Sequence, residues 1–332
     1  MSLFSIIAGV IFLAILGWLF TQPASYRVVR GRSICADSDA IFPLLQDLMH
    51  WPSWSPWLIH EPDALLDHSD SSDQVGSWYR WSGDYIGSGR VTLESLTPGH
   101  QLEHKLEFMK PMRSSSTVRF ELKPEGDDKT RVDWIMEGKF PFLFRWMGPM
   151  MDRMIGGDFE LGLVQLAREA GDADAQLQIH FVGTVQTEAV HYCYQPHEGP
   201  AQSLPTVLEQ QFTALLETAH HLGIELTAPP FILYHRMDAI TGQVRCDICL
   251  PLPDGQSLPG HDHDNLPSQQ CERTEMRGEY RFMPLAWHAS FGHLRMKKKK
   301  LDKGQPMIER YVTDPRTMHG LERITQIDLP IR

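Results

Sequence analysis

The chain has 332 residues, enough for two ordinary domains, and 42% of them are hydrophobic while 22% are charged. This composition is typical of globular proteins and excludes a chain that is disordered throughout. The formal net charge of -11 argues against a nucleic-acid partner. Binding to a phosphate backbone needs clustered cations, and the sequence has one dense cationic run, Lys297 to Lys300.

The first predicted element is an uncharged apolar run, LFSIIAGVIFLAILGWLF, at residues 3–20. It is close to the roughly 20 apolar residues that a bilayer-spanning helix needs. A cleaved secretory signal is the alternative, but no Lys or Arg precedes the run and no small-x-small cleavage site follows it. The sequence therefore predicts a retained membrane anchor over residues 1–22.

The flank of the predicted anchor sets its expected orientation. Arg27, Arg30 and Arg32 follow the apolar run closely. Under the positive-inside rule we expect a single-pass membrane protein whose folded domains lie on the cytoplasmic side. The five cysteines, an odd number spread over a long chain, are unlike a disulfide framework and agree with a reducing compartment.

Residues 25–171 are predicted to form a first α+β domain. YRVVRGRSI alternates like a strand, and ADSDAIFPLLQDLMHW carries apolar residues at helical spacing, with Asp37 or Ser38 as the N-cap. HWPSWSPW follows, and its prolines argue against both a regular helix and a central strand. The next five runs predict an antiparallel meander: GSWYRWSG, GRVTLESLTPG, QLEHKLEFM, SSTVRFELKPEGDD and TRVDWIMEGKF.

One face of this predicted sheet is apolar and needs a cover. Val118, Phe120 and Leu122 alternate along STVRFEL, so all three side chains point to the same face. The segment from Pro141 to Ala170 ends in GGDFELGLVQLAREA, which has apolar residues at helical spacing. We therefore expect a sheet wrapped around a long C-terminal helix.

Several of these motifs together resemble the SRPBCC superfamily of START-like and polyketide-cyclase-like domains. They are WPSWSPW, GSWYRWSGD, GSGRVTLESLTPGHQLEHKLEFMKP and MMDRMIGGDFELGLVQL. The resemblance implies a helix-grip fold with an apolar cavity between a curved sheet and the long helix. Trp54, Trp57 and Trp78 are candidate ligand contacts there, and the alternative is that these rings only close the core.

Residues 177–332 are predicted to form a second domain that contains an internal repeat. PFILYHRMD, residues 230–238, aligns with PMIERYVTD, residues 306–314, with proline first and aspartate last. Each copy follows a strand-like run and a helical pattern, and each is followed by another strand, which gives a βαββ unit written twice. In this alignment Leu233 occupies the place of Glu309.

The second half resembles the AraC-type effector-binding family, also described as gyrase-inhibitor-like small-molecule-binding domains. The motifs that carry the resemblance are HEGP, RGEY, LAW, APPFILYHRMD and the PMIERYVTDP…TQIDLPI ending. It implies a duplicated βαββ fold in which Glu309 faces a ligand cleft and pairs with cationic or polar ligands. A subset of the family hydrolyses small electrophilic molecules.

Four aromatic residues of the second half are candidates for the walls of a binding site that contains Glu309. They are Tyr234, Trp287, Phe291 and Tyr311, although helix residues such as Trp287 are often simple core. On local grounds Glu309 lies in a short strand, and its side chain faces either a cleft or solvent.

A zinc site is the metal-binding alternative for the second domain. Cys246 and Cys249, with His261, His263 and Cys271 downstream, have the right ligand types. Two cysteines three residues apart in a strand point to opposite faces, however, and HDHDN is typical of a polar loop. We therefore expect neither a metal nor another cofactor.

These observations predict a membrane-tethered protein that binds small apolar or cationic molecules as a sensor or carrier. The alternative is a hydrolase of small electrophilic compounds with Glu309 as general base, but the sequence shows only a proton acceptor, so we assign no catalytic residue. A third hypothesis is a structural tether whose domains bind protein. Because no basic helix-turn-helix precedes the second domain, a transcription factor is not favoured.

Overall fold

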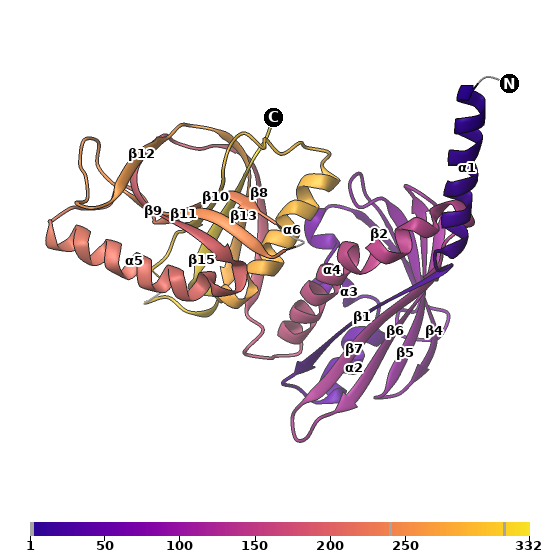
Figure 1. The fold of residues 1–332 in the computed structure, drawn as a ribbon. Coiled ribbons are helices and arrows are strands. Elements are labelled where there is room, and N and C mark those ends of the chain that lie inside the picture. Colours follow the sequence, from indigo (N-terminus) through magenta and orange to yellow (C-terminus); the bar gives the residue numbers. More distant parts are fainter. Residues whose placement is uncertain (1–2, 239–240, 315–316) are drawn as a thin grey trace. The chain divides into compact units, whose positions relative to one another are not determined.

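The computed structural model describes residues 3–238, 241–314 and 317–332 (Figure 1). The chain splits into two compact units, Met1–Ala175 and Gln176–Arg332. The first two residues of the predicted anchor and Pro315, the last residue of the PMIERYVTDP motif, lie outside the described residues.

The N-terminal run forms helix α1, Leu3–Thr21. A bilayer span needs about 20 consecutive apolar residues in one helix. Among the residues that the structure describes, no helix meets the length and apolarity needed to cross a membrane. This finding corrects the predicted anchor over residues 1–22, together with the single-pass localisation and the cytoplasmic placement that rested on it.

The first unit is built on a seven-stranded antiparallel sheet in the order β1-β7-β6-β5-β4-β3-β2. The strands are β1 (Ser25–Ile34), β2 (Leu65–His68), β3 (Trp78–Ser82), β4 (Ser88–Thr97), β5 (Gln101–Lys110), β6 (Ser114–Pro124) and β7 (Thr130–Lys139). The predicted antiparallel meander is confirmed, and β2 is a strand that the sequence patterns did not predict. The alternating side chains of Val118, Phe120 and Leu122 are buried, as their shared face requires.

Helical segments cover the apolar face of this sheet. They are α2 (Ser38–Gln46), α3 (Trp51–Trp54), the 3-10 helix η1 (Leu58–His60) and the long helix α4 (Gly148–Glu169). The 3-10 helix η2 (Phe142–Met147) leads into α4 and has no buried residue. Pro52 lies in the first turn of α3, where a missing N–H costs no hydrogen bond, so the tryptophan-rich segment forms one helical turn. The buried face of α4 includes Phe159, Leu163 and Leu166. The predicted α+β class, with a sheet against a long helix, is confirmed for this unit.

The second unit is built on an eight-stranded antiparallel sheet in the order β12-β9-β11-β10-β14-β15-β13-β8. Its strands are β8 (Leu177–Gln186), β9 (Val190–Pro200), β10 (Phe231–Met237), β11 (Gln243–Pro251), β12 (Asp262–Leu266), β13 (Gln270–Gly278), β14 (Met307–Tyr311) and β15 (Ile324–Pro330). The order is symmetric about the β10–β14 pair, as a duplicated βαββ unit predicts. The HDHDN segment, predicted to be a loop, belongs largely to β12, which pairs with β9.

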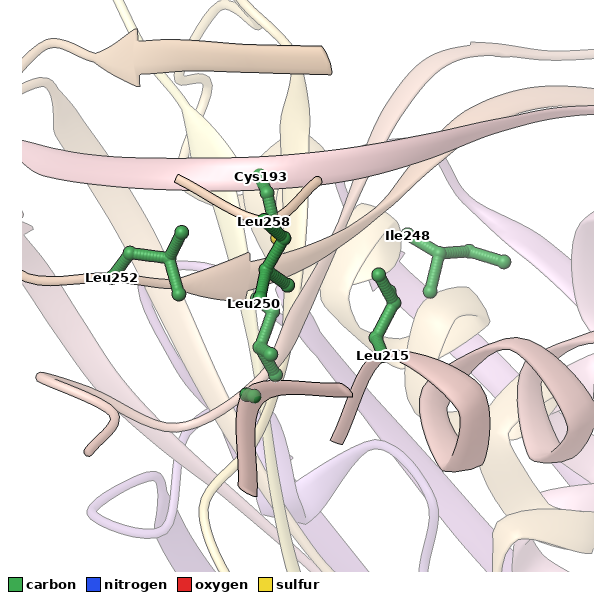
Figure 2. Close-up of a cluster of buried hydrophobic side chains, with 7 residues drawn as sticks. Cys193, Leu215, Ile248, Leu250, Leu252 and Leu258 are labelled. Carbon is green, nitrogen blue, oxygen red and sulfur yellow. The ribbon is translucent and has the colours of Figure 1, made fainter. Parts of the chain in front are cut away.

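Each repeat contributes one helix to the same face of this sheet. Helix α5 (Leu204–His221) contacts β9 and β11, and α6 (Met283–Met296) contacts β8, β13 and β15. Each helix has a proline in its first turn and follows a 3-10 turn, η3 (Ala201–Ser203) or η4 (Tyr280–Phe282). Figure 2 shows Leu215 of α5 beside Ile248 of β11, within the apolar cluster that joins this helix to the sheet. Glu309 shares a face with Ile248, because both are level with Ile232.

Pairing in the sheet corrects the proposed equivalence between Leu233 and Glu309. Ile232 is the direct cross-strand neighbour of Glu309, whereas Leu233 pairs with Ile308 on the other face. Side chains of consecutive strand residues point to opposite faces, so Leu233 cannot match Glu309 in a symmetric sheet. Shifting the alignment by one residue matches Ile232 with Glu309 and Tyr234 with Tyr311, and each of these pairs shares a face of the sheet.

Candidate functional site

The carboxylate of Glu309 is the centre of the candidate site. Its side chain rises from β14 onto the face covered by α5 and α6, and the residue is only 4% exposed. Three donors converge on it. Tyr311 Oη donates to Oε1 at 2.6 Å, while Trp287 Nε1 and Tyr234 Oη donate to Oε2 at 2.8 and 3.2 Å. Four of the predicted site residues thus lie together.

Different elements position these donors. Tyr234 comes from β10, Trp287 from the first turns of α6, and Tyr311 from the end of β14. The two tyrosines occupy corresponding positions in the two repeats, so the duplication places one hydroxyl on each side of a single carboxylate. Each repeat therefore contributes one tyrosine donor, whereas the charged group, Glu309, comes from the second repeat only.

The charge of Glu309 is balanced by hydrogen bonds alone. Burial raises its pKa, and the bonds from Tyr311, Trp287 and Tyr234 oppose that shift because they favour the ionised form. Among the described residues, no lysine, arginine or histidine pairs with this carboxylate. The neighbouring Arg310 points to the other face, where it pairs with Asp328. An ionised carboxylate has about four lone-pair sites, so roughly one remains for a further donor.

Partly exposed aromatic rings surround this buried centre. Phe291 lies 5.8 Å from Trp287 between ring centroids, so the last predicted site residue of this unit also belongs to the group. Phe212 of α5 and Tyr280 of η4 each meet the ring of Tyr311 edge-on at 5.4 Å. The site is therefore made by both repeats and by both helices.

Phe212 and Tyr280 were not predicted from the sequence to be site residues. Phe212 has a helical-face signal, since it precedes the buried Leu215 and Ala219 on the side of α5 that packs on the sheet. Tyr280 is the tyrosine of RGEY. Only the paired strands show that both rings meet at Tyr311.

The predicted tryptophans of the first unit divide into two groups. Trp54 is buried, donates from Nε1 to the Leu44 carbonyl at 3.0 Å, and packs edge-on against Trp134 at 5.6 Å. Trp57 donates to Asp158 Oδ2 of α4 at 3.2 Å and also meets Trp134 edge-on. Trp134 stacks in parallel on Phe159 at 4.3 Å. These rings join the sheet to α4.

Trp78 does not join this aromatic group. It is half-buried and lies on the opposite face of β3 from the buried Tyr79 and Trp81. The guanidinium groups of Arg90 and Arg80 lie 4.4 and 5.2 Å from the centroid of its ring. Its surroundings are therefore cationic, whereas those of Trp54 and Trp57 are mainly aromatic.

A buried histidine in the first unit was also not predicted from the sequence. His104 of β5 has no exposed surface and lies edge-on to Trp51 at 4.9 Å. Neither ring nitrogen has a hydrogen-bond partner among the described residues, and burial lowers the pKa of the imidazole to about 3. The alternation of QLEHKLEFM places His104 on the same face as Leu102 and Leu106, which is the signal that could have found it.

The cysteines predicted to face opposite sides of a strand do so. Cys246 pairs with Tyr234 on the face of Glu309, whereas Cys249 packs with Phe231 and Leu233 on the other face. In the first unit, ligand atoms of Cys35, Asp172 and Asp174 lie within 4.8 Å of one another. The Asp172 carboxylate there accepts backbone N–H bonds from the other two residues, which is its structural role.

Comparison with protein-family models finds a match in the first unit. Residues 25–171 match the family described as Polyketide cyclase / dehydrase and lipid transport. The match supports a small-molecule-binding fold in this part of the chain. No curated protein matches the chain.

Three of the solved structures that are similar to this chain are 13–16% identical to it in sequence. Protein MLL2253 from Mesorhizobium loti is 16% identical, with 45% of this chain and 98% of that chain covered and a TM-score of 0.35. The EcmrR C-terminal domain is 16% identical, with 47% and 98% covered and a TM-score of 0.40. SAV2435, solved with bound tetraphenylphosphonium, is 13% identical, with 45% and 92% covered and a TM-score of 0.37.

Proposed function

We propose that this protein binds small organic cations at Glu309 in a domain over residues 177–332, and acts as a sensor or carrier. The observation that carries the proposal is the convergence of three donors on one buried carboxylate, which has no cationic partner among the described residues. A buried charge of this kind is costly unless it is paired. A cationic ligand supplies the missing partner.

The aromatic surroundings support the same ligand class. A cation over the face of Trp or Tyr is attracted by the ring quadrupole, by about 2 kcal/mol when desolvated. Trp287 and the pair of tyrosines lie directly at the carboxylate, and Phe212 and Phe291 flank them. Charge and apolar contact are therefore available in one place. The duplicated βαββ arrangement supports the resemblance to AraC-type effector-binding domains.

The first domain, residues 25–171, is proposed as a separate binding unit for an apolar ligand. The match to a family described by polyketide chemistry and lipid transport supports it, and Trp54 and Trp57 are the proposed contacts. Trp78 is not included, because it lies on the opposite face of the sheet from the buried aromatic residues.

A hydrolase that uses Glu309 as general base is less well supported. A base must keep a lone pair directed at the reacting centre. Three donors already occupy the carboxylate, and they stabilise its charged form rather than its protonated form. Roughly one lone-pair site remains, and the three hydrogen bonds oppose its use for taking up a proton, whereas burial acts in the other direction.

The test is isothermal titration calorimetry with benzyltrimethylammonium on the full chain, comparing wild type with Glu309→Gln. We expect the substitution to weaken binding by about 100-fold, because loss of one partner of a buried charge pair costs roughly 2–5 kcal/mol. Glu275→Gln is the matched control, since Glu275 lies on the other face and pairs with Arg277. Equal affinity of wild type and Glu309→Gln would contradict the proposal, as would no binding to wild type.

The pH dependence gives a second readout with a defined sign. Burial raises the pKa of Glu309 in the free protein, so this group takes up a proton at a higher pH than an ordinary glutamate does. A permanent cation binds only the ionised form. Affinity is therefore expected to rise with pH through the raised pKa and then level off, and Glu309→Gln is expected to remove this dependence.

A further inference from the structure

Two hydroxyl groups beside the Glu309 site lack hydrogen-bond partners among the described residues. They are Oγ1 of Thr325 and Oη of Tyr280, and both atoms are buried. Thr325 has no exposed surface at all. A buried polar group left without a partner is destabilising, so these two hydroxyls need an explanation.

Strand pairing places Thr325 on the same face as Glu309. Thr325 is the direct cross-strand neighbour of Tyr311, and Ile327, two residues further on, is the neighbour of Glu309. Thr325 and Glu309 are therefore diagonal neighbours, whose Cα atoms are about 7–8 Å apart in antiparallel sheets. The threonine hydroxyl thus lies within the reach of a small molecule held by the carboxylate.

Tyr280 also contacts Tyr311, the cross-strand neighbour of Thr325. Its ring meets that of Tyr311 edge-on at 5.4 Å, and the guanidinium of Arg323 lies 4.8 Å from the centroid of its own ring. Arg323 is in turn held by an ion pair with Glu279, the residue before Tyr280. The tyrosine is therefore fixed at the site by contacts on both of its sides.

From this arrangement we propose a polar subsite, made by Thr325 and Tyr280, for an oxygen of the ligand that Glu309 holds. The proposal rests on cation binding at Glu309 and narrows it to organic cations that carry a hydroxyl or carbonyl oxygen a few bonds from the charged nitrogen. Both protein hydroxyls can donate and accept, so a ligand hydroxyl satisfies one as donor and the other as acceptor. Purely hydrocarbon cations leave both groups unpartnered.

The experiment uses a matched pair of amines that differ by one hydroxyl, phenethylamine and 2-amino-1-phenylethanol, both cationic at pH 7. Calorimetric titration of the full chain is expected to show about tenfold tighter binding of the hydroxylated amine. Thr325→Val exchanges the hydroxyl for a methyl group, and Tyr280→Phe removes the hydroxyl. Both variants keep the shape of the side chain. In each variant the ratio of the two affinities is expected to fall toward one, because only the hydroxylated amine loses a hydrogen bond.

Tyr194→Phe is the control variant, because Tyr194 lies on the opposite face and packs against the cluster that contains Phe231. Its affinity ratio is expected to match that of wild type. Equal binding of both amines to wild type, or a preference that survives in Thr325→Val and Tyr280→Phe, would overturn the polar subsite alone. Failure of both amines to bind wild type would overturn cation binding itself.

Discussion

Glu309 in the second unit and His104 in the first are both buried ionisable groups on the helix-covered face of an antiparallel sheet, yet their surroundings are opposite. Glu309 receives three hydrogen bonds. His104 receives none among the described residues and faces aromatic rings. The comparison shows that burial alone does not define a binding site. Hydrogen-bond donors that converge on a buried ionisable side chain stabilise its charged form. A buried ionisable side chain without hydrogen-bond partners stays neutral.

The largest expected effect comes from replacing Glu309 by an apolar residue. Glu309→Leu leaves Tyr234, Trp287 and Tyr311 without an acceptor, and the expected loss is about 3–5 kcal/mol of unfolding free energy for the second unit. Hydrogen exchange of β10 and β14 peptides in the full chain measures it. Glu309→Gln keeps an acceptor oxygen and serves as the control with a smaller loss. An unchanged exchange rate in Glu309→Leu would show that the three bonds contribute nothing to stability.

Acid is expected to destabilise the first unit through His104. The unfolded histidine binds a proton below its ordinary pKa of about 6.5, whereas the folded one does not until its pKa of about 3. Stability is therefore lost as pH falls between these values, by roughly 2–3 kcal/mol at pH 4.5. The measurement is the difference in stability between wild type and His104→Leu, followed by hydrogen exchange from pH 7 to 4.5. A difference that does not change with pH would contradict the neutral buried state.

A smaller effect is expected where α4 meets the sheet. A Cβ at Gly162 would lie 2.6 Å from the Trp134 ring and 3.1 Å from Pro56. Because Trp134 is itself buried, Gly162→Ala should cost about 1–3 kcal/mol through overpacking. Gly17→Ala is the control, a helical position with no atom within 4 Å of the added Cβ. Thermal denaturation that ranks Gly162→Ala as no less stable than Gly17→Ala would contradict the close packing.

The smallest expected effect is a gain in stability on replacing His104 by an apolar residue, opposite in sign to the effect at Glu309. At pH 7, His104→Leu removes two unpartnered nitrogen atoms from an apolar site, so the first unit should gain about 1 kcal/mol. Glu309→Leu, by contrast, should lose stability at the same pH. Denaturant unfolding of the full chain, with hydrogen exchange to assign each transition, measures both. A destabilised His104→Leu protein would mean that the imidazole makes a favourable interaction within the core.

Much of the fold was predictable from the sequence. Alternation along STVRFEL predicted the buried set of Val118, Phe120 and Leu122, and helical spacing predicted the buried face of α4. These predictions succeed because burial of one face is a local property of strand and helix geometry. The N-terminal run shows the limit of local signals, since its apolar composition predicted a membrane anchor that the structure contradicts.

The sequence by itself determined the two-sheet α+β class, the duplication of the βαββ unit, and the presence of Glu309 in the second copy where the first copy has an apolar residue. The tertiary structure decided which residues face Glu309. Pairing of β10 with β14 made Ile232 rather than Leu233 its counterpart, and it brought Tyr234 and Tyr311 to one carboxylate. The physical reason is that strand register is set by contacts between distant segments, and a shift by one residue moves every side chain to the other face.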